Sequence, residues 1–553
     1  MKLSTQFHGG VRGADVPKRS DQFEGRFGRM FRSLPAAQFA DADLLALARE
    51  EAMLSPPETD GQGRPSAAPE TEADGEENFD IPAGHTYFGQ FIDHDITFDP
   101  ASSLDRQNDP EALTDFRTPR LDLDSLYGRG PDDQPYLYDP ADLRKFARGV
   151  ALTQGNKPSA SYDHLRVNGR ALLGDKRNDE NVIVSQLHGA FMQFHNTLCD
   201  LLGTDVPFEA VQQQVRWHYQ YVVLHDFLPT ICGLDMVHSV LPHLKSGKSI
   251  FEDKPALRFY HWRNGPFIPI EFSAAAYRFG HSMVRPIYRL NSELDMGGGA
   301  MGENDALKGR NLIFAGVSSR ALNGFKPFPT QWAIDWRLFF GDPRKTKLDK
   351  YRVQPAYKLD ASIVNPLGFL PEFSSTDKVP PLDRLTKGNL NPPLKPGEIT
   401  NNLALRNLKR GLSMGLPSGE AVARAMAVPE LPPEKILIGK AAFEGSDLEA
   451  RPITEVAPAL AHNTPLWAYV LAEAAAQWKA EVDRQGLDGQ AANFVGMHLG
   501  EVGGRIVAET LIGLMLADSH SFLRQDPRWV PWAGGRDPQF DMTKLLKVAG
   551  LFG

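Results

Sequence analysis

The segment Phe88-Gly89-Gln90-Phe91-Ile92-Asp93-His94-Asp95 is the most informative part of this chain, because it places an imidazole between two carboxylates with an amide one helical turn earlier. On a helix, Gln90 and His94 share a face, and Asp93 lies beside that face. Asp95 points away from it. Two roles are therefore open: the first three polar residues could line one cavity, while Asp95 could serve a cation site behind it.

Composition sets the class of protein. The chain has 553 residues, of which 42% are hydrophobic and 23% charged, so it can bury a large core. This indicates a soluble globular protein. The net charge of -9 argues against a nucleic-acid partner, which would need a basic face. Small or neutral partners fit better.

The chain has two cysteines, Cys199 and Cys232. We therefore expect buried thiols rather than a disulfide framework or a thiolate metal cluster. The first ten residues lack the apolar core of a secretory signal. No run approaches the ~20 apolar residues of a membrane span. We expect a cytoplasmic location, although unconventional export would leave no such signal.

Hydrophobic periodicity predicts a mainly α protein with little β-structure. Apolar residues three to five apart predict a helix over 182–202. Thr464-Pro465 predicts an N-cap and a first helical residue, opening a helix through about Lys479. A further helix is expected from about Val502 to Leu516. On the first of these helices, His188 and His195 are interpreted as core histidines rather than as a metal pair.

The domain organisation follows from composition. Residues 55–78 contain four prolines, three glycines and seven acidic residues, and they predict a flexible linker or surface loop. Residues 1–54 would be an N-terminal extension packed on the domain. Residues 79–553 would form one large helical domain.

The segment Thr118-Pro119-Arg120-Leu121-Asp122-Leu123-Asp124-Ser125 offers an oxygen ligand at every second residue, as an extended loop does around a hard cation. The side chains of Thr118, Asp122 and Asp124 and the carbonyl of Arg120 would join Asp95 around calcium. An acidic surface turn is the alternative.

Three further segments carry reactive residues. Arg177 and Glu180 lie one turn apart at the head of the helix over 182–202, either as an exposed charge pair or as a buried functional pair. His281 follows a glycine in an apolar stretch, where a lone histidine is usually a core residue. Asn407 could fix an imidazole by accepting its N–H.

Together and in this order, these segments resemble the animal-type haem peroxidases, the group that includes myeloperoxidase and lactoperoxidase and is related to the cyclooxygenases. The resemblance covers about residues 80–420, through Gly-Gln-x-x-Asp-His-Asp, Asp-x-Asp-Ser-Leu-Tyr-Gly, Arg-x-x-Glu, Arg-Phe-Gly-His and Asn-Leu-x-Arg-Gly. It implies one helical haem peroxidase domain around a buried haem b. It also implies reduction of hydrogen peroxide through a high-valent iron-oxo intermediate and oxidation of a halide, a pseudohalide or a phenolic donor.

The resemblance assigns roles at the iron. His281 is similar to the proximal ligand and Asn407 to its hydrogen-bond partner. His94 is similar to the distal base, which moves a proton between the two peroxide oxygens. Arg177 is similar to the distal guanidinium that stabilises developing negative charge. Gln90 would order distal water and any bound halide.

Other residues would hold the cofactors. Arg278 and Arg410 fall on cofactor-binding positions. Asp93 and Glu180 match positions that form ester bonds to haem methyl groups. The family's most oxidising member has a methionine after the glutamate, where this chain has Asn181, so at most two ester links are expected and efficient chloride oxidation is in doubt. The resemblance also supports the calcium ligands Asp95, Thr118, Arg120, Asp122 and Asp124.

Two alternatives stay open. A fatty-acid dioxygenase on the same scaffold would need a radical-forming tyrosine three residues before His281, where this chain has Arg278. Tyr277 is one place too early, and about 100° of helical rotation would turn it away from the cavity. A non-catalytic haem- and calcium-binding adhesion protein would predict damage to His94, Arg177 or His281, and all three are present.

Overall fold

The computed structural model describes residues 25–56, 71–98, 114–115, 117–263, 265–294, 309–314, 321–370, 401–441 and 450–552. Its longer helices are α1 (Asp41–Ala48), α2 (Gly84–Ile96), α4 (Val182–Leu202), α5 (Phe208–Val222), α11 (Leu403–Ser413), α12 (Gly419–Met426), α14 (Leu466–Gln485) and α16 (Glu501–Ala517). Shorter turns of helix include α3 (Asp124–Tyr127), α6 (Leu228–Cys232), α7 (Leu234–Val240), α8 (Pro242–Ser246), α9 (Ile270–Ser273), α17 (Phe522–Gln525), α18 (Met542–Val548), and the 3₁₀ turns η4 (Lys176–Asp179) and η6 (Ala276–His281).

The described strands are short and form only small sheets. Strand β1 (Gly25–Gly28) lies between β10 (Ile268–Pro269) and β3 (Thr114–Asp115) in a three-stranded sheet. The pairs are β2 (Glu77–Pro82) with β13 (Pro355–Tyr357), β4 (Tyr138–Asp139) with β5 (Asp142–Phe146), β6 (Ala151–Gln154) with β7 (Lys157–Tyr162), β8 (Arg166–Val167) with β9 (Arg170–Ala171), β11 (Ile287–Arg289) with β12 (Arg310–Leu312), and β14 (Leu437–Ile438) with β15 (Arg451–Pro452). The fold is mainly α, as predicted.

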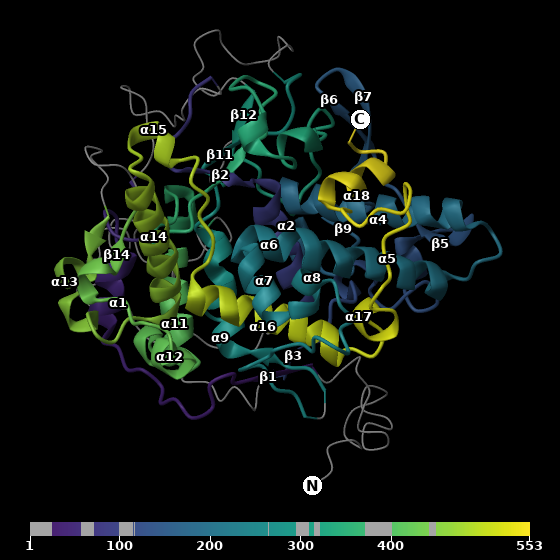
Figure 1. Cartoon of the computed structure of the whole chain (residues 1–553). Helices are drawn as coiled ribbons and strands as arrows, with labels where there is room; N and C mark the ends of the chain where they lie inside the picture. The colour runs from purple at the N-terminus through teal and green to yellow at the C-terminus, as the bar shows by residue number, and fades with distance from the viewer. Residues whose placement is uncertain are drawn as a thin grey trace, which may run out of the picture.

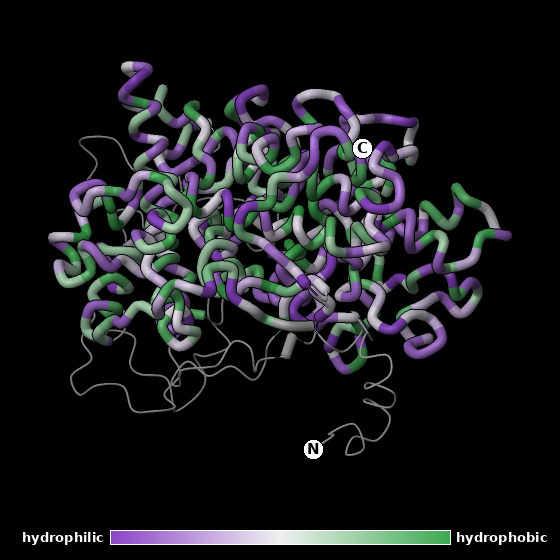
Figure 2. Tube along the Cα trace, turned by 60° about the horizontal axis from the view of Figure 1, so that its bottom comes forward, coloured by the Kyte–Doolittle hydropathy of each residue, from purple (hydrophilic) through white to green (hydrophobic). Residues whose placement is uncertain are grey.

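Helix α2 lies near the middle of the molecule, close to α6 and α7, with α14 to its left and α16 below it in this view (Figure 1). It contacts α4, η4 and η6. Phe88 and Phe91 fix its position on α4, since both stack on Phe191, with ring centroids 6.1 and 4.7 Å away. Hydrophobic segments gather toward the middle of the molecule (Figure 2).

The predicted helix over 182–202 is confirmed as α4. It begins after Asn181 because that side chain accepts hydrogen bonds from the backbone N–H groups of Ile183 and Val184, which is the usual N-cap arrangement. The helix expected from Val502 to Leu516 is α16, one residue longer at each end.

The helix after Thr464 differs from its prediction at both ends. It begins at Leu466 and continues to Gln485, six residues beyond Lys479. Thr464 does not cap it, because its hydroxyl donates to the buried carboxylate of Glu420 instead. A tertiary partner has replaced the local one.

The described part of the N-terminal region belongs to the same core as the rest. Phe27, Leu44 and Met53 are buried in one continuous apolar cluster with the later helices. Residues 57–70 of the predicted linker lie outside the described residues. Its end is not a loop: Glu77 begins β2, is fully buried, and binds Arg285 and Arg352.

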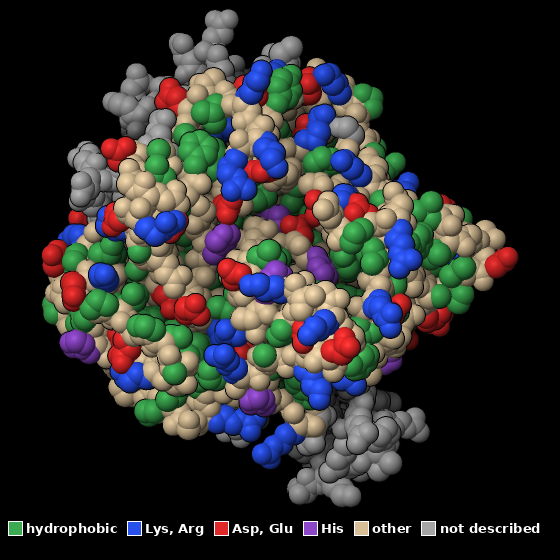
Figure 3. Space-filling view, in the orientation of Figure 1, with side chains coloured by type: hydrophobic (Ala, Val, Ile, Leu, Met, Phe, Trp, Pro, Cys, Tyr) green, Lys and Arg blue, Asp and Glu red, His purple; other side chains and the backbone are tan. Residues whose placement is uncertain are grey.

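Surface charge agrees with the composition. On the face shown in Figure 3, Lys and Arg side chains are interspersed with Asp and Glu, rather than forming a stripe of one sign. Among the described residues, none of the helices combines the length and the apolarity that crossing a bilayer requires. Both cysteines are free and buried, as expected.

Gly84 gives a test of how α2 is seated. A Cβ at this position would lie 2.5 Å from the backbone oxygen of Phe339, which cannot move aside easily. Gly84→Ala should therefore destabilise the protein by about 1–3 kcal/mol. Thermal unfolding measures this, with Gly75→Ala as the control, because a Cβ there meets nothing within 4 Å. Equal melting temperatures for the two variants would show that α2 tolerates displacement.

Candidate active site

A cavity of about 310 Å³ lies between α2, η6 and α11. It brings together side chains from segments far apart in the sequence, and His94 and His281 both line it. The predicted site residues on its wall are Gln90, Asp93, His94, Glu180, Arg278, His281 and Arg410. Seven of the predicted residues therefore share one cavity.

His94 is buried and held in one tautomer. Its Nδ1 lies 2.8 Å from Oδ1 of Asn178, which can only accept, so Nδ1 carries the proton and Nε2 keeps its lone pair. Burial, together with the charge of Arg177, lowers the pKa of His94 to about 4. His94 is therefore a neutral base at ordinary pH.

Asn178 is a site residue that the sequence reasoning missed. Its Nδ2 donates to Nδ1 of His188, 3.0 Å away, and this fixes which end of the amide faces His94. His188 is a buried core histidine, as interpreted, and burial holds its pKa well below the usual range. The signal was the position of Asn178 directly after Arg177, within η4, which contacts α2.

Gln90 is fixed by two neighbours on the cavity wall. Its Nε2 donates to Oε2 of Glu180 at 3.0 Å, and its Oε1 accepts from Asn181 at 3.1 Å. Asp93, one turn further along α2, accepts from the hydroxyl of Thr97 at 3.0 Å. The two carboxylates thus lie on one cavity wall, at the positions where ester links were predicted.

Asn407 lies beside His281 as predicted, but the hydrogen bond runs in the opposite direction. Its Oδ1 accepts from Arg278 at 3.0 Å, so its Nδ2 faces Nδ1 of His281 at 2.8 Å and donates to it. The sequence could not show this, because the orientation of the amide is set by Arg278. Burial and the neighbouring Arg278 lower the pKa of His281 to about 3, so the imidazole is neutral.

Arg177 is not among the described residues that line the cavity, which differs from its predicted place. Its guanidinium binds Asp175 at 2.8 Å, and its Nη2 donates to the backbone oxygen of His94 at 3.0 Å. Although burial opposes ionisation, Arg177 and Arg117 hold the pKa of Asp175 well below its usual range. Arg177 therefore lies behind His94 in this structure, bound to its backbone oxygen.

Positive charge collects on one side of the cavity. Arg278, Arg406 and Arg410 all line it. Burial and repulsion from the other two guanidinium groups lower the pKa of Arg278 to about 10. Like charges gathered in a buried cavity are costly, so this wall is suited to a bound dianion.

The predicted orientation of Tyr277 is wrong. The residue lines the cavity instead of pointing away from it. The prediction assumed that the cavity borders one face of this segment, whereas it also borders Arg278 and His281 of the 3₁₀ turn over 276–281, so a rotation of one residue does not remove Tyr277 from its wall. Its ring stacks on Phe272, with centroids 4.4 Å apart. Its hydroxyl is buried and has no hydrogen-bond partner among the described residues.

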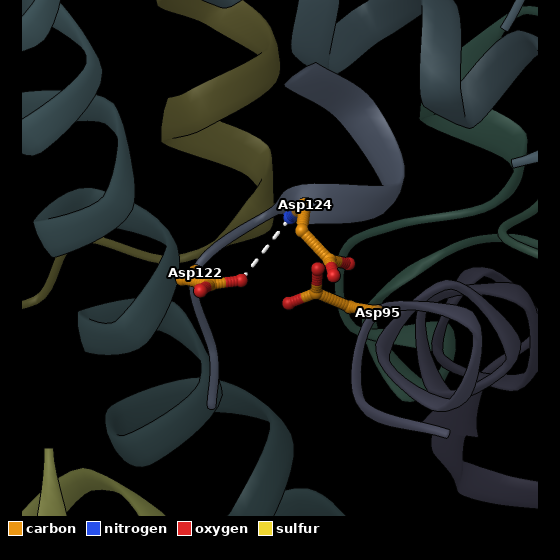
Figure 4. Close-up of side chains that lie close together, drawn as sticks. All are labelled: Asp95, Asp122 and Asp124. Atoms are coloured by element: carbon orange, nitrogen blue, oxygen red, sulfur yellow. Dashed lines mark hydrogen bonds between the residues drawn. The ribbon is translucent and has the colours of Figure 1, made fainter. Parts of the chain in front are cut away.

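A second cluster lies behind His94, where Asp95, Asp122 and Asp124 meet (Figure 4). One carboxylate oxygen from each lies within 4.8 Å of the others. Asp122 also accepts from the backbone N–H of Asp124 at 3.2 Å and from the hydroxyl of Thr118 at 2.8 Å. One oxygen of Asp95 is buried without a hydrogen-bond partner.

Electrostatics make this cluster unfavourable without a cation. Burial and repulsion from Asp122 raise the pKa of Asp95 to about 8, and the same causes raise that of Asp124 well above its usual range. Thr118 adjoins the cluster through Asp122. Arg120 approaches Asp518 with its side chain, at 3.5 Å.

Comparison with known proteins identifies proteins that are similar to parts of this chain. The family model for animal haem peroxidase matches residues 104–325, which include Arg177, Glu180 and His281. Human thyroid peroxidase is 23% identical over 220 residues, 36% of this chain and 22% of that protein. A peroxidase-like protein of Margaritifera margaritifera is 24% identical over 265 residues, 37% of this chain and 32% of that protein. The matched regions thus cover less than a third of these relatives.

Comparison of the fold with solved structures covers a larger share of the chain than the sequence comparisons do. Peroxidase A from Dictyostelium discoideum superposes with a TM-score of 0.56 at 13% identity, covering 95% of this chain and 93% of that one. This similarity is one of fold. The mainly helical architecture expected from the sequence is thereby confirmed, and the family model supports the expected resemblance over residues 104–325.

The tautomer of His94 is testable directly. In ¹⁵N NMR of histidine-labelled protein, His94 should carry its proton on Nδ1 and stay neutral down to about pH 4. In Asn178→Asp, a carboxylate beside Nδ1 should raise the titration midpoint by about one pH unit or more, because it favours the charged imidazole. Asn196→Asp, which changes an amide of α4 bonded to Phe146, is the control and should leave His94 unchanged. An unchanged titration midpoint of His94 in Asn178→Asp would show that Asn178 does not set the protonation of His94.

Proposed function

We propose that this chain, a member of the animal haem peroxidase family, is a haem peroxidase that reduces hydrogen peroxide and oxidises a small donor. The observation that carries the proposal is one cavity lined by two neutral histidines, His94 and His281, with arginines on its wall. Imidazole is a common haem ligand and the commonest proton-transfer group.

The residues present fit a haem. Haem b carries two carboxylates, and the guanidinium groups of Arg278, Arg406 and Arg410 offer complementary charge. His281 would bind the iron and Asp93 and Glu180 would adjoin the haem edge. When bound, the haem would supply the redox-active iron at which the peroxide bond is broken.

The orientation of Asn407 explains how haem uptake would change the proximal side. A metal needs the lone pair of Nε2 on His281, which requires the proton to lie on Nδ1. Asn407 must then present Oδ1 instead of Nδ2. A carboxylate that engages Arg278 would free that oxygen, since Arg278 is its present donor.

His94 would move the proton on the distal side. Its Nε2 is unprotonated, so it would accept a proton from hydrogen peroxide and return it to the departing oxygen. Asn178 would keep Nδ1 as the donor throughout. The charge-stabilising role predicted for Arg177 would require its guanidinium to leave Asp175, and Gln90 is placed to hold water beside His94.

Asp93 and Glu180 support a proposal of covalent attachment, because both carboxylates lie on the cavity wall. Asn181 stands there in place of a methionine, so a sulfonium link is excluded by chemistry. At most two ester links would form. Bromide, iodide, thiocyanate or phenols are therefore better candidate donors than chloride.

A calcium ion in the acidic cluster is a further part of the proposal. Three buried carboxylates with one unpartnered oxygen suit a hard cation with oxygen ligands. Thr118 and the carbonyl of Arg120 would add ligands. Since Asp95 follows His94 directly, such an ion would hold the helix that carries the distal base.

One observation favours a second function. Tyr277 lines the cavity, so the argument from its orientation against a fatty-acid dioxygenase fails. Oxygen uptake with linoleate that disappears in Tyr277→Phe would support that alternative. Peroxide-dependent oxidation of iodide or phenol without such uptake would support the peroxidase.

Rapid mixing with hydrogen peroxide tests the main proposal. The haem-loaded protein should show a fast change in its Soret absorption, and iodide or a phenol should restore the starting spectrum. His94→Ala should slow this change by about 10²–10⁴, the usual contribution of a general acid–base group. His238→Ala, which alters a histidine outside the cavity, is the control. A Soret band that does not change when peroxide is added would favour the non-catalytic adhesion protein instead.

Thermal unfolding tests the calcium proposal. The folded pKa of Asp95 is raised to about 8 from the ordinary 3.8, so the folded state binds more protons between these values. Without added cation, stability should therefore fall as pH rises from about 4 to 8. Calcium at a hundred times the Kd measured at pH 8 should add about 2.7 kcal/mol at pH 8, and the same calcium concentration should add less at pH 5, where Asp95 is protonated.

The matched variants for calcium are Asp95→Asn and Asp132→Asn. The first removes a buried ligand and should abolish the calcium response, whereas the second changes an exposed carboxylate and should keep it. A calcium response that survives in Asp95→Asn would place the ion elsewhere.

A further inference from the structure

Arg117 joins the acidic cluster to the buried carboxylate that holds Arg177. Its Nη1 lies 3.4 Å from Oδ1 of Asp124, and its Nη2 lies 2.6 Å from Oδ2 of Asp175. One guanidinium group therefore contacts both a carboxylate of the candidate cation site and the carboxylate behind His94. The chemistry proposed above gives Arg117 no role.

Two guanidinium groups share Asp175, and they compete for one of its oxygens. Nε and Nη2 of Arg117 lie 3.1 and 2.6 Å from Oδ2. Nε and Nη2 of Arg177 lie 3.2 and 2.8 Å from the same atom. A carboxylate oxygen offers about two lone-pair sites, so it cannot satisfy all of these donors fully. A stronger bond to one arginine therefore weakens the bond to the other.

The burial of Asp175 decides when Arg177 can leave it. The Asp175 side chain is 2% exposed, and an unpaired charge at such a position is costly. The two guanidinium groups also lie against one ring, since the Cζ atoms of Arg117 and Arg177 are 5.9 and 4.7 Å from the ring centre of Phe98. Like charges this close repel each other. Release of Arg177 would therefore relieve repulsion, provided that Arg117 stays with the carboxylate.

Arg117 is placed to stay. Its Nη2 also donates to the backbone oxygen of Gly174 at 3.3 Å, and its contact with Asp175 is shorter than that with Asp124. A divalent cation among the clustered carboxylates would take Asp124 as a ligand and would repel the guanidinium. Arg117 would then bind Asp175 more strongly, at the expense of Arg177.

We propose that Arg117 is a positioning residue that couples cation binding in the acidic cluster to the hold of Asp175 on Arg177. Without a cation, Asp124 and Asp175 share Arg117, and Asp175 retains Arg177. With a divalent cation bound, Arg117 is confined to Asp175 and Arg177 is released. The inference rests on the proposed function, in which Arg177 must leave Asp175 to stabilise charge, and it names the contact that controls this step.

The first test follows the guanidinium of Arg177 in the purified full chain. In ¹⁵N NMR of arginine-labelled protein, the Nε–H signal of Arg177 is the one that Arg177→Lys lacks. Calcium chloride should speed the exchange of this proton with water at least ~tenfold, because its bond to a charged acceptor is lost. The Nε–H of Arg117 should stay protected. An unchanged Arg177 signal in protein that has bound calcium would overturn the proposal.

Calcium affinity tests the coupling from the other direction, because linkage between two sites is reciprocal. Isothermal titration with calcium chloride gives the Kd for the unmodified protein, Arg177→Gln, Arg117→Lys and the double variant. Arg177→Gln should tighten calcium binding at least ~threefold, since Asp175 then draws Arg117 away from Asp124 without competition. In the Arg117→Lys background the same change should alter the Kd less than ~twofold, because one ammonium group cannot contact both carboxylates.

The four proteins separate this coupling from a general effect of charge. Arg177→Gln removes one positive charge in both backgrounds, so its long-range effect on calcium cancels. Arg117→Lys keeps a cation beside Asp175, so the double variant leaves this carboxylate paired. Lys176→Gln is the matched control, since Lys176 is an exposed residue of the same turn as Arg177. It should leave the calcium Kd within ~twofold of its value in the unmodified protein.

Failure of this inference is separable from failure of the proposed function. If the unmodified chain binds no calcium, the calcium proposal and the inference both fall. If calcium binds and Arg177→Gln has the same effect in both backgrounds, only the inference falls. The exchange measurement on the unmodified protein decides the question even if the double variant does not fold. Neither measurement uses peroxide turnover, so the peroxidase proposal is tested independently by the Soret response.

Discussion

The direct succession of His94 and Asp95 on α2 is the constraint on which the rest of the site depends. Because neighbouring helical residues point about 100° apart, the imidazole enters the cavity while the carboxylate enters the acidic cluster behind it. The position of the base is thus tied to the state of that cluster. Phe88 and Phe91 lock the rotation of the helix through their contacts with Phe191. A small turn of α2 would misplace both groups at once.

Two concentrations of like charge flank this helix. Arginines gather on the cavity wall, and carboxylates gather behind His94. Neither arrangement stabilises the fold by itself, since burial and repulsion shift the pKa of Arg278 down and that of Asp95 up. Each is suited to a partner of opposite charge. In the proposal made above, a dianionic cofactor would stabilise the first group of charges and a divalent cation the second, so that ligand binding and folding stability would be linked at both.

Much of the fold and of the candidate site could be predicted from hydrophobic periodicity and from the order of the motifs. The helix over 182–202 and the one near 502–516 follow from apolar spacing, and both were correctly placed. The family motifs brought Gln90, Asp93 and His94 to the same cavity as Glu180 and His281. These predictions succeed because a helix fixes which neighbours share a face, and because local motifs keep their geometry within a shared fold.

The sequence by itself determined the helical class, the resemblance to the animal haem peroxidases and the set of candidate site residues. Only the tertiary structure decided how those residues are oriented. Asp175 holds Arg177 behind His94, Arg278 sets the orientation of the Asn407 amide, and the cavity extends to Tyr277 as well as to Arg278. The pairing of His85 with Asp226 spans 141 residues. Side-chain orientation depends on such distant or competing partners, and one-dimensional spacing contains no information about them.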